Sequence, residues 1–110
     1  MLKGLILVIG TIGLAGLLVA ASNRSTAIEP NQVVIKDFSF EPATLTVKAG
    51  TKVTWINRDG DPHTVDEVNK RFKSGAMDTD AEYSFTFNSP GTFKYFCALH
   101  PKMTGQVIVQ

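Results

Sequence analysis

The sequence predicts an all-β domain, built as a sandwich or a small barrel, and three observations support this fold class. Short apolar or alternating segments recur along residues 32–109, with turn residues between them. In several of these segments apolar and polar side chains alternate, which is the period of a half-buried strand. No long stretch of this region has a convincing apolar period of 3.6, so the sequence does not favour amphipathic helices.

The expected strands, in chain order, are 32–36, 44–48, 51–57, 83–87, 92–96 and 106–109. The third alternates with Val53 and Trp55 on one face, so we expect Trp55 in the core. Turn residues at Ala49-Gly50 and at 88–91 separate neighbouring strands.

Residues 66–80 interrupt this pattern, because they are polar and lack a strand period. We expect irregular structure there, with Phe72 and Met77 as its buried anchors. The acidic side chains of this stretch are interleaved with basic ones, so they do not indicate an electrostatic docking face.

The N-terminal residues have a different composition. Lys3 is the sole charged residue of 1–21, which end in the small residues Ala20 and Ala21. This pattern predicts a secretory signal peptide cleaved after Ala21 or Ser22. The apolar stretch is longer than a usual signal core, so an uncleaved membrane anchor is the alternative. We expect a polar linker at 22–31 and one domain at 32–110, outside the cytoplasmic membrane in either case.

Charge and cysteine content limit the function classes. The chain has 11 basic and 10 acidic side chains, for a formal net charge of +1. This balance, without a basic stripe, argues against nucleic-acid binding and against broad binding to anionic membranes. Cys97 is the single cysteine and cannot form an internal disulfide, so metal ligation or simple burial must explain it.

Two short segments contain all the side chains that suggest chemistry. Cys97, His100 and Met103 are spaced three residues apart, and we expect them in a loop between two strands. The second histidine of the chain, His63, lies upstream, and we expect it at the end of a neighbouring strand. Separately, each has an ordinary interpretation: a buried thiol, hydrogen-bonded histidines and a methionine that fills the core. Together, one thiolate, two imidazoles and a weak thioether are the ligands of a blue-copper electron-transfer site. Zinc is the weaker candidate because thioether is not among its usual ligands.

The chain resembles the cupredoxins, and most closely their amicyanin/plastocyanin-like branch, over nearly all of residues 32–109. The matching segments are Phe38-Ser-Phe-Glu-Pro42, Val47-Lys-Ala-Gly50, Val53-Thr-Trp-Ile-Asn57, Pro62-His63 and Gly91 through Met103. The resemblance implies a Greek-key β-sandwich with one copper ion at one end. It also implies His63, Cys97 and His100 as the strong ligands, with Met103 as a long axial ligand.

Two positions depart from the family pattern. Thr64 stands where many members have an asparagine that supports the cysteine loop, so the rigidity of that loop is in question. Leu99 stands where amicyanins tend to have proline. Its backbone N–H is expected to donate to the Cys97 sulfur and favour Cu(I), so that Leu99→Pro lowers the reduction potential.

The expected function is that of an exported type 1 copper protein, a monomer that carries single electrons between a redox donor and a redox acceptor. The resemblance implies docking near His100, beside Leu99, Pro101 and Met103. A periplasmic copper-handling module, either a chaperone or a storage protein, is the alternative. An enzyme is not expected, because both histidines are needed for one copper and none is left for a second centre. Any membrane contact would be made by an uncleaved N-terminal segment.

Overall fold

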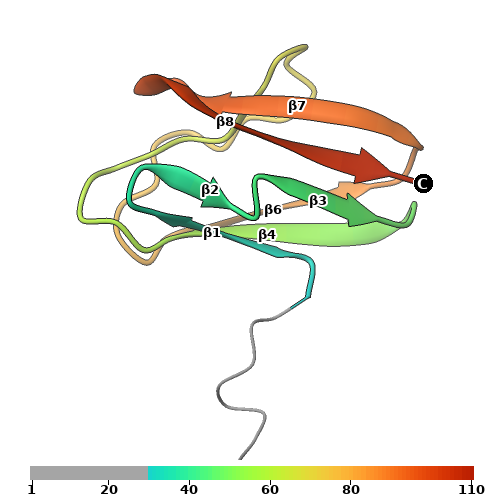
Figure 1. The fold of residues 1–110 in the computed structure, drawn as a ribbon, viewed down its shortest axis with the longest axis horizontal. Coiled ribbons are helices and arrows are strands. Elements are labelled where there is room, and N and C mark those ends of the chain that lie inside the picture. The colour runs from blue at the N-terminus through green and yellow to red at the C-terminus, as the bar shows by residue number, and fades with distance from the viewer. Residues whose placement is uncertain (1–29) are drawn as a thin grey trace, which may run out of the picture.

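The computed structural model describes residues 30–110, and every regular element in this range is a β-strand (Figure 1). In chain order the strands are β1 (Gln32–Lys36), β2 (Ser39–Glu41), β3 (Thr44–Val47), β4 (Thr51–Asn57), β5 (Asp66–Glu67), β6 (Glu82–Phe87), β7 (Gly91–Cys97) and β8 (His100–Val109). None of the described segments forms a helix with the length and hydropathy needed to cross a membrane. The predicted signal peptide or anchor, and nearly all of the predicted linker, lie outside the described residues.

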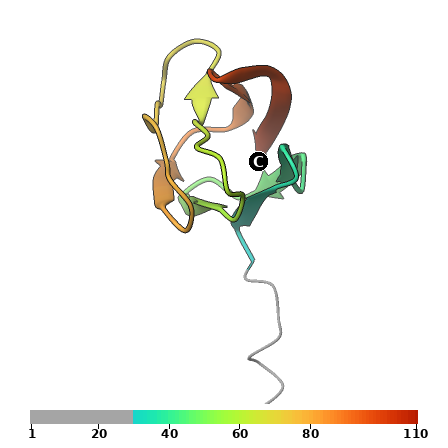
Figure 2. The ribbon, with the colours of Figure 1, turned by 90° about the vertical axis from the view of Figure 1, so that its left-hand side faces the viewer.

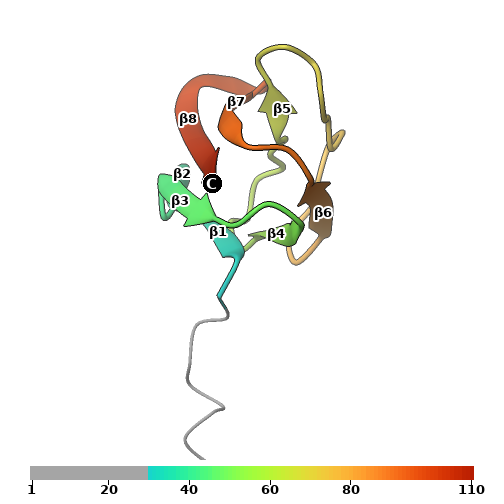
Figure 3. The ribbon, with the colours of Figure 1, turned by 90° about the vertical axis from the view of Figure 1, so that its right-hand side faces the viewer.

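The strands form two four-stranded sheets, in the orders β2-β1-β4-β6 and β3-β8-β7-β5. Parallel pairing joins β1 to β4 and β3 to β8, while the other pairs are antiparallel. Seen end-on, the two sheets face each other around a common interior (Figure 3). The predicted all-β sandwich is confirmed.

Most strand boundaries agree with the sequence-based expectation, and β1 and β4 have the expected bounds. Two strands were not predicted from the sequence, β2 and β5, which contain three and two residues. β8 is longer than predicted, because it begins at His100 and remains paired with β7 along its length. Segments this short carry too few residues for an alternating pattern to show, and Pro101 in β8 is a residue that usually weakens a strand prediction.

The core is an aromatic cluster between the sheets. Trp55 has no exposed surface, and its ring lies close to those of Phe72, Phe87 and Tyr95. Phe72 and Met77, the expected anchors of the irregular segment, are both buried. Rings of this size contribute strongly to stability through the area they bury and through edge-to-face contacts.

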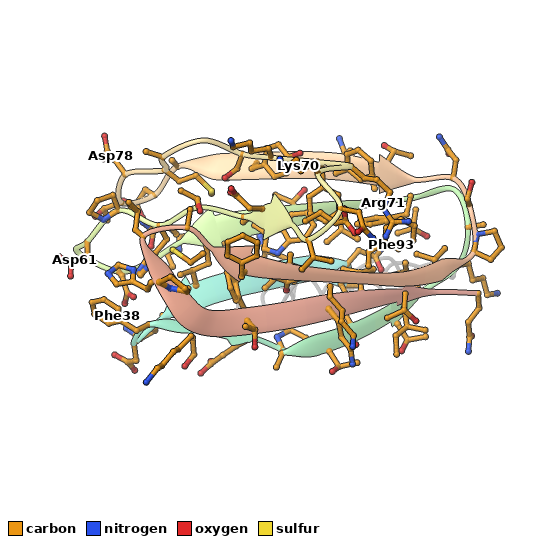
Figure 4. All side chains as sticks on the ribbon, turned by 90° about the horizontal axis from the view of Figure 1, so that it is seen from above. Phe38, Asp61, Lys70, Arg71, Asp78 and Phe93 are labelled. Atoms are coloured by element: carbon orange, nitrogen blue, oxygen red, sulfur yellow. The ribbon has the colours of Figure 1, made fainter. Side chains whose placement is uncertain are left out.

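A buried carboxylate organises the irregular segment. Glu67 Oε1 accepts hydrogen bonds from the backbone N–H groups of Asn69 and Arg71, and its Oε2 pairs with the Arg71 guanidinium at 2.6 Å. That guanidinium also lies 4.2 Å from the centre of the Phe93 ring (Figure 4). The Arg71 side chain holds the pKa of Glu67 below its usual value despite burial, and the backbone donors act in the same direction. Glu67 therefore remains ionised at neutral pH and fixes a segment that has little regular pairing.

Several connections meet at one end of the sandwich. The β1–β2 and β7–β8 turns gather there with the segments before β5 and before β6, and this end faces the viewer in Figure 2. The C-terminus lies at the opposite end, as Figure 1 shows. Both histidines and the cysteine belong to the connections and strand ends of this one region.

Candidate metal centre

Three metal-binding side chains meet at this end of the sandwich. One donor atom from each of His63, Cys97 and His100 lies within 4.8 Å of the others. The Cys97 Sγ atom is 3.7 Å from His63 Nδ1 and 3.6 Å from His100 Nδ1. His63 and Cys97 are fully buried, while His100 is partly exposed. The site is therefore closed to solvent on two sides and reaches the surface at His100.

The β7–β8 hairpin places two of these side chains. Cys97 is the last residue of β7, His100 is the first of β8, and the two pair directly across a two-residue turn. All three downstream residues, including Met103, were expected in a loop. That was wrong for Met103, which is buried within β8, because strand pairing resumes immediately after the turn.

His63 comes from a different connection. It was expected at the end of a neighbouring strand, but β4 ends at Asn57, and His63 lies in the connection that follows. Two backbone hydrogen bonds with Met77 hold it, from His63 N–H to the Met77 carbonyl at 3.2 Å and from Met77 N–H to the His63 carbonyl at 2.8 Å. This isolated bridge holds His63 in place, although no strand ends there.

The orientation of the His63 ring is set by Asp59. His63 Nε2 lies 2.8 Å from Asp59 Oδ2, and an ionised carboxylate can only accept a hydrogen bond. The proton is therefore on Nε2, and the lone pair of Nδ1 points toward the Cys97 sulfur. A carboxylate behind a histidine in this way fixes the tautomer and orientation of a metal-binding imidazole.

Asp59 is itself held in the ionised form. Burial would raise the pKa of its carboxyl, but the backbone N–H groups of Phe38 and Asp37, together with the His63 ring, bring that pKa below its usual value. Asn57 shapes the same connection, since its side chain donates to the carbonyls of Asp61 and Met77 and accepts from the Asp59 N–H.

Thr64 holds the cysteine from the opposite side. Its backbone N–H donates to Cys97 Sγ at 3.3 Å, and its hydroxyl oxygen accepts the Ala98 N–H at 2.7 Å. Threonine at this position thus supports the β7–β8 turn even though it has no amide group.

The expected bond from the Leu99 N–H to the Cys97 sulfur is absent from residues 30–110, where the backbone donor to that sulfur is Thr64. Leu99→Pro therefore has no such bond through which to lower the potential.

The spacing of the donors suits a metal ion. A trigonal ion with bonds of about 2.0 Å to nitrogen and about 2.3 Å to sulfur would place each nitrogen about 3.7 Å from the sulfur. The two observed distances are 3.7 and 3.6 Å. The residues present therefore fit a metal with two imidazole ligands and one thiolate ligand.

Comparison with known proteins agrees with this geometry. A family model described as a cupredoxin-like domain matches residues 8–109. The chain belongs to the cupredoxin family.

Amicyanins and plastocyanins are among the relatives of this cupredoxin. Amicyanin-alpha of Methylorubrum extorquens is 38% identical over 89 residues, which cover 72% of this chain and 71% of the relative. Chloroplastic plastocyanin of Tetradesmus obliquus is 35% identical, with 84% of this chain and 77% of the relative covered. A variant amicyanin solved in its Cu(I) form superposes with a TM-score of 0.70 at 35% identity, covering 78% of this chain and 88% of that one.

The three side chains that meet in this cupredoxin were predicted from the sequence, but the residues that orient them were not. Asp59 had no predicted role, and Phe38 entered only as part of a segment that resembles the family. A weak signal for Asp59 was available, because an acidic residue four positions before a candidate metal histidine can reach its outer nitrogen. The support that Thr64 gives to the β7–β8 turn could not be predicted from its residue type, because it depends on where the Ala98 N–H lies.

The role of Thr64 can be tested by Thr64→Val, which keeps the shape of the side chain but removes the acceptor for the Ala98 N–H. We expect the metal-free cupredoxin to lose about 1–3 kcal/mol of unfolding free energy, because a backbone donor at the turn is left unpaired. Urea unfolding measures this, and Thr64→Ser, which retains the hydroxyl, should recover most of the loss. Equal stabilities for the valine and serine variants would contradict the role.

Proposed function

We propose that this cupredoxin is a type 1 copper protein that carries single electrons between redox partners. His63, Cys97 and His100 would bind the copper ion, and Met103 would supply a further, weak sulfur ligand. The observation that carries the proposal is the spacing of the two Nδ1 atoms from the Cys97 sulfur, at 3.7 and 3.6 Å. Both distances are close to those that a trigonal ion of the kind found in blue-copper sites would give.

Copper suits this donor set better than zinc does. Thiolate and thioether sulfurs are soft ligands that stabilise Cu(I), and imidazole binds both oxidation states of copper. Structural zinc sites are built instead from four nitrogen, thiolate or carboxylate ligands. Among residues 30–110, the one cluster of histidine, cysteine or acidic side chains with metal-binding spacing is this site.

The chain's own residues keep the site rigid. Asp59 holds the His63 ring in one tautomer, and Thr64 holds both the Cys97 sulfur and the turn that follows it. Copper supplies the reversible change between Cu(II) and Cu(I). Because the ligands are fixed by hydrogen bonds to the protein, little needs to rearrange when the charge changes.

The exposed edge of His100 is the proposed route for the electron. Leu99 and Phe38 are about half exposed, at 51% and 47%, and Pro101 is exposed beside them. We propose that the donor and the acceptor dock on the surface formed by Phe38, Leu99 and Pro101 beside His100, because these three exposed side chains are apolar. The protein acts as a monomer outside the cytoplasmic membrane, in the periplasm or an equivalent compartment, and has no substrate to turn over.

The test is a Cu(II) titration of the purified chain followed by visible absorption, reduction and re-oxidation. We expect one copper per chain, an intense thiolate-to-copper band, and reversible bleaching by a mild reductant. Electron self-exchange, measured by NMR line broadening in mixtures of the Cu(I) and Cu(II) forms, should be fast. A colourless complex, or a coloured one that exchanges electrons slowly and releases copper to a chelator, would favour the copper-handling alternative.

A further inference from the structure

The turn between β1 and β2 has an unusual backbone. Lys36 pairs with Ser39, so the connection consists of Asp37 and Phe38 alone. Both have positive φ, at 53° and 56°, which is the pattern of a type I′ turn. Glycine and asparagine are preferred at these positions because a bulky side chain is strained there. Phenylalanine at the second position is therefore a poor choice for the turn itself.

The Asp59 carboxylate holds this turn in place. Its Oδ1 accepts the Asp37 N–H at 2.7 Å, and its Oδ2 accepts the Phe38 N–H at 2.9 Å. The same Oδ2 is bonded to His63 Nε2. One side chain thus joins the strained turn to a proposed copper ligand.

The Phe38 ring lies against both imidazoles. Its centre is 5.1 Å from that of His63 and 4.8 Å from that of His100, with interplanar angles of 85° and 87°. These are edge-to-face contacts, the geometry that aromatic rings favour. Figure 4 shows Phe38 at the end of the sandwich, the same end as Asp61. The ring is nevertheless 47% exposed, so it covers the imidazoles without being part of the core.

We propose that Phe38 is a positioning residue for the two imidazoles. Its ring limits the rotation of His100, the partly exposed ligand, and keeps both imidazoles oriented for the metal. Strain that persists beside a site, where glycine would remove it, indicates a function for the strained residue. The proposal deepens the proposed function and rests on it, since an ordered His100 matters most for rapid electron exchange.

A purely structural role for Phe38 makes the opposite prediction. If the ring served only to cover apolar surface, its removal would lower stability and leave the motion of His100 unchanged. Replacement by glycine or asparagine separates the two cases. Both residues adopt positive φ more easily than phenylalanine, and both retain the backbone N–H that Asp59 accepts.

The experiment compares Phe38→Gly and Phe38→Asn with Phe38→Tyr, which keeps the ring. In the metal-free chain, urea unfolding should show equal or higher stability for the glycine and asparagine variants, while NMR relaxation of the His100 ring carbons shows greater motion. In the copper-loaded chain, self-exchange should slow by about tenfold, since small misplacements of reacting groups are costly. Phe38→Tyr should match the parent protein in His100 motion.

Unchanged His100 motion in both ring-less variants overturns the proposal, whatever happens to stability. Greater His100 motion in these variants, restored by tyrosine, supports it. The relaxation measurement needs no copper, so it decides this inference separately from the proposed function. If the parent protein binds copper but does not exchange electrons, the electron-carrier function fails, and the His100 motion still shows whether Phe38 positions the ligand.

Discussion

Cys97→Ser is expected to abolish both the intense visible band and reversible electron exchange, while the fold remains intact. The band requires charge transfer from a thiolate to Cu(II), and a serine hydroxyl neither ionises at neutral pH nor provides soft sulfur for Cu(I). Cys97 is fully buried at the end of β7, and serine is close to it in size. The stability of the metal-free chain should therefore change by only about 1 kcal/mol.

Visible absorption and voltammetry of the copper-loaded chain measure the loss. Met103→Leu is the matched comparison, since it removes the other sulfur proposed as a ligand and fills the same buried space on β8. We expect this variant to keep an intense band, with a changed reduction potential, because the two imidazoles and the thiolate remain. A strong visible band in Cys97→Ser would show that copper binds elsewhere and would contradict the proposed site.

The sequence was sufficient for the core strands and for selecting three side chains, His63, Cys97 and His100, that the fold brings together. β1 and β4 are long enough to show their apolar pattern, and Trp55 falls on the inward face as its neighbours require. The chain contains one cysteine and two histidines, so few combinations of these side chains could make a metal site. Local pattern and residue type therefore determined these features.

The sequence could not show the contacts that hold the donors in place. Asp59 reaches His63 and the β1–β2 turn together, and this depends on how two separate connections approach each other. The hydroxyl of Thr64 meets the Ala98 N–H across 34 positions of sequence. Such contacts have no local periodicity, so a prediction based on residue spacing and propensity does not detect them.

The effect on stability should be largest for Gly105→Ala. Gly105 lies on β8 directly opposite Tyr95 of β7, and the tyrosine ring covers it. A Cβ atom at Gly105 would lie 2.5 Å from Tyr95 Oη and 2.6 Å from Cζ, well inside contact distance. Tyr95 cannot easily move away, because its ring is buried against Phe40 and Trp55. We expect a loss of about 3 kcal/mol of unfolding free energy, as for other overpacked cores.

Gly60→Ala is the control, since a Cβ atom there would meet nothing within 4 Å. Its unfolding free energy in urea should stay within about 0.5 kcal/mol of the parent value. In a double-mutant cycle, Gly105→Ala combined with Tyr95→Leu should be less destabilised than the sum of the single changes by about 1 kcal/mol or more, because leucine lacks the atoms that clash. Additive effects would show that the tyrosine ring is not the obstacle. Since β7 ends at Cys97 and β8 begins at His100, the same clash should disturb the copper spectrum, whereas Gly60→Ala should leave it unchanged.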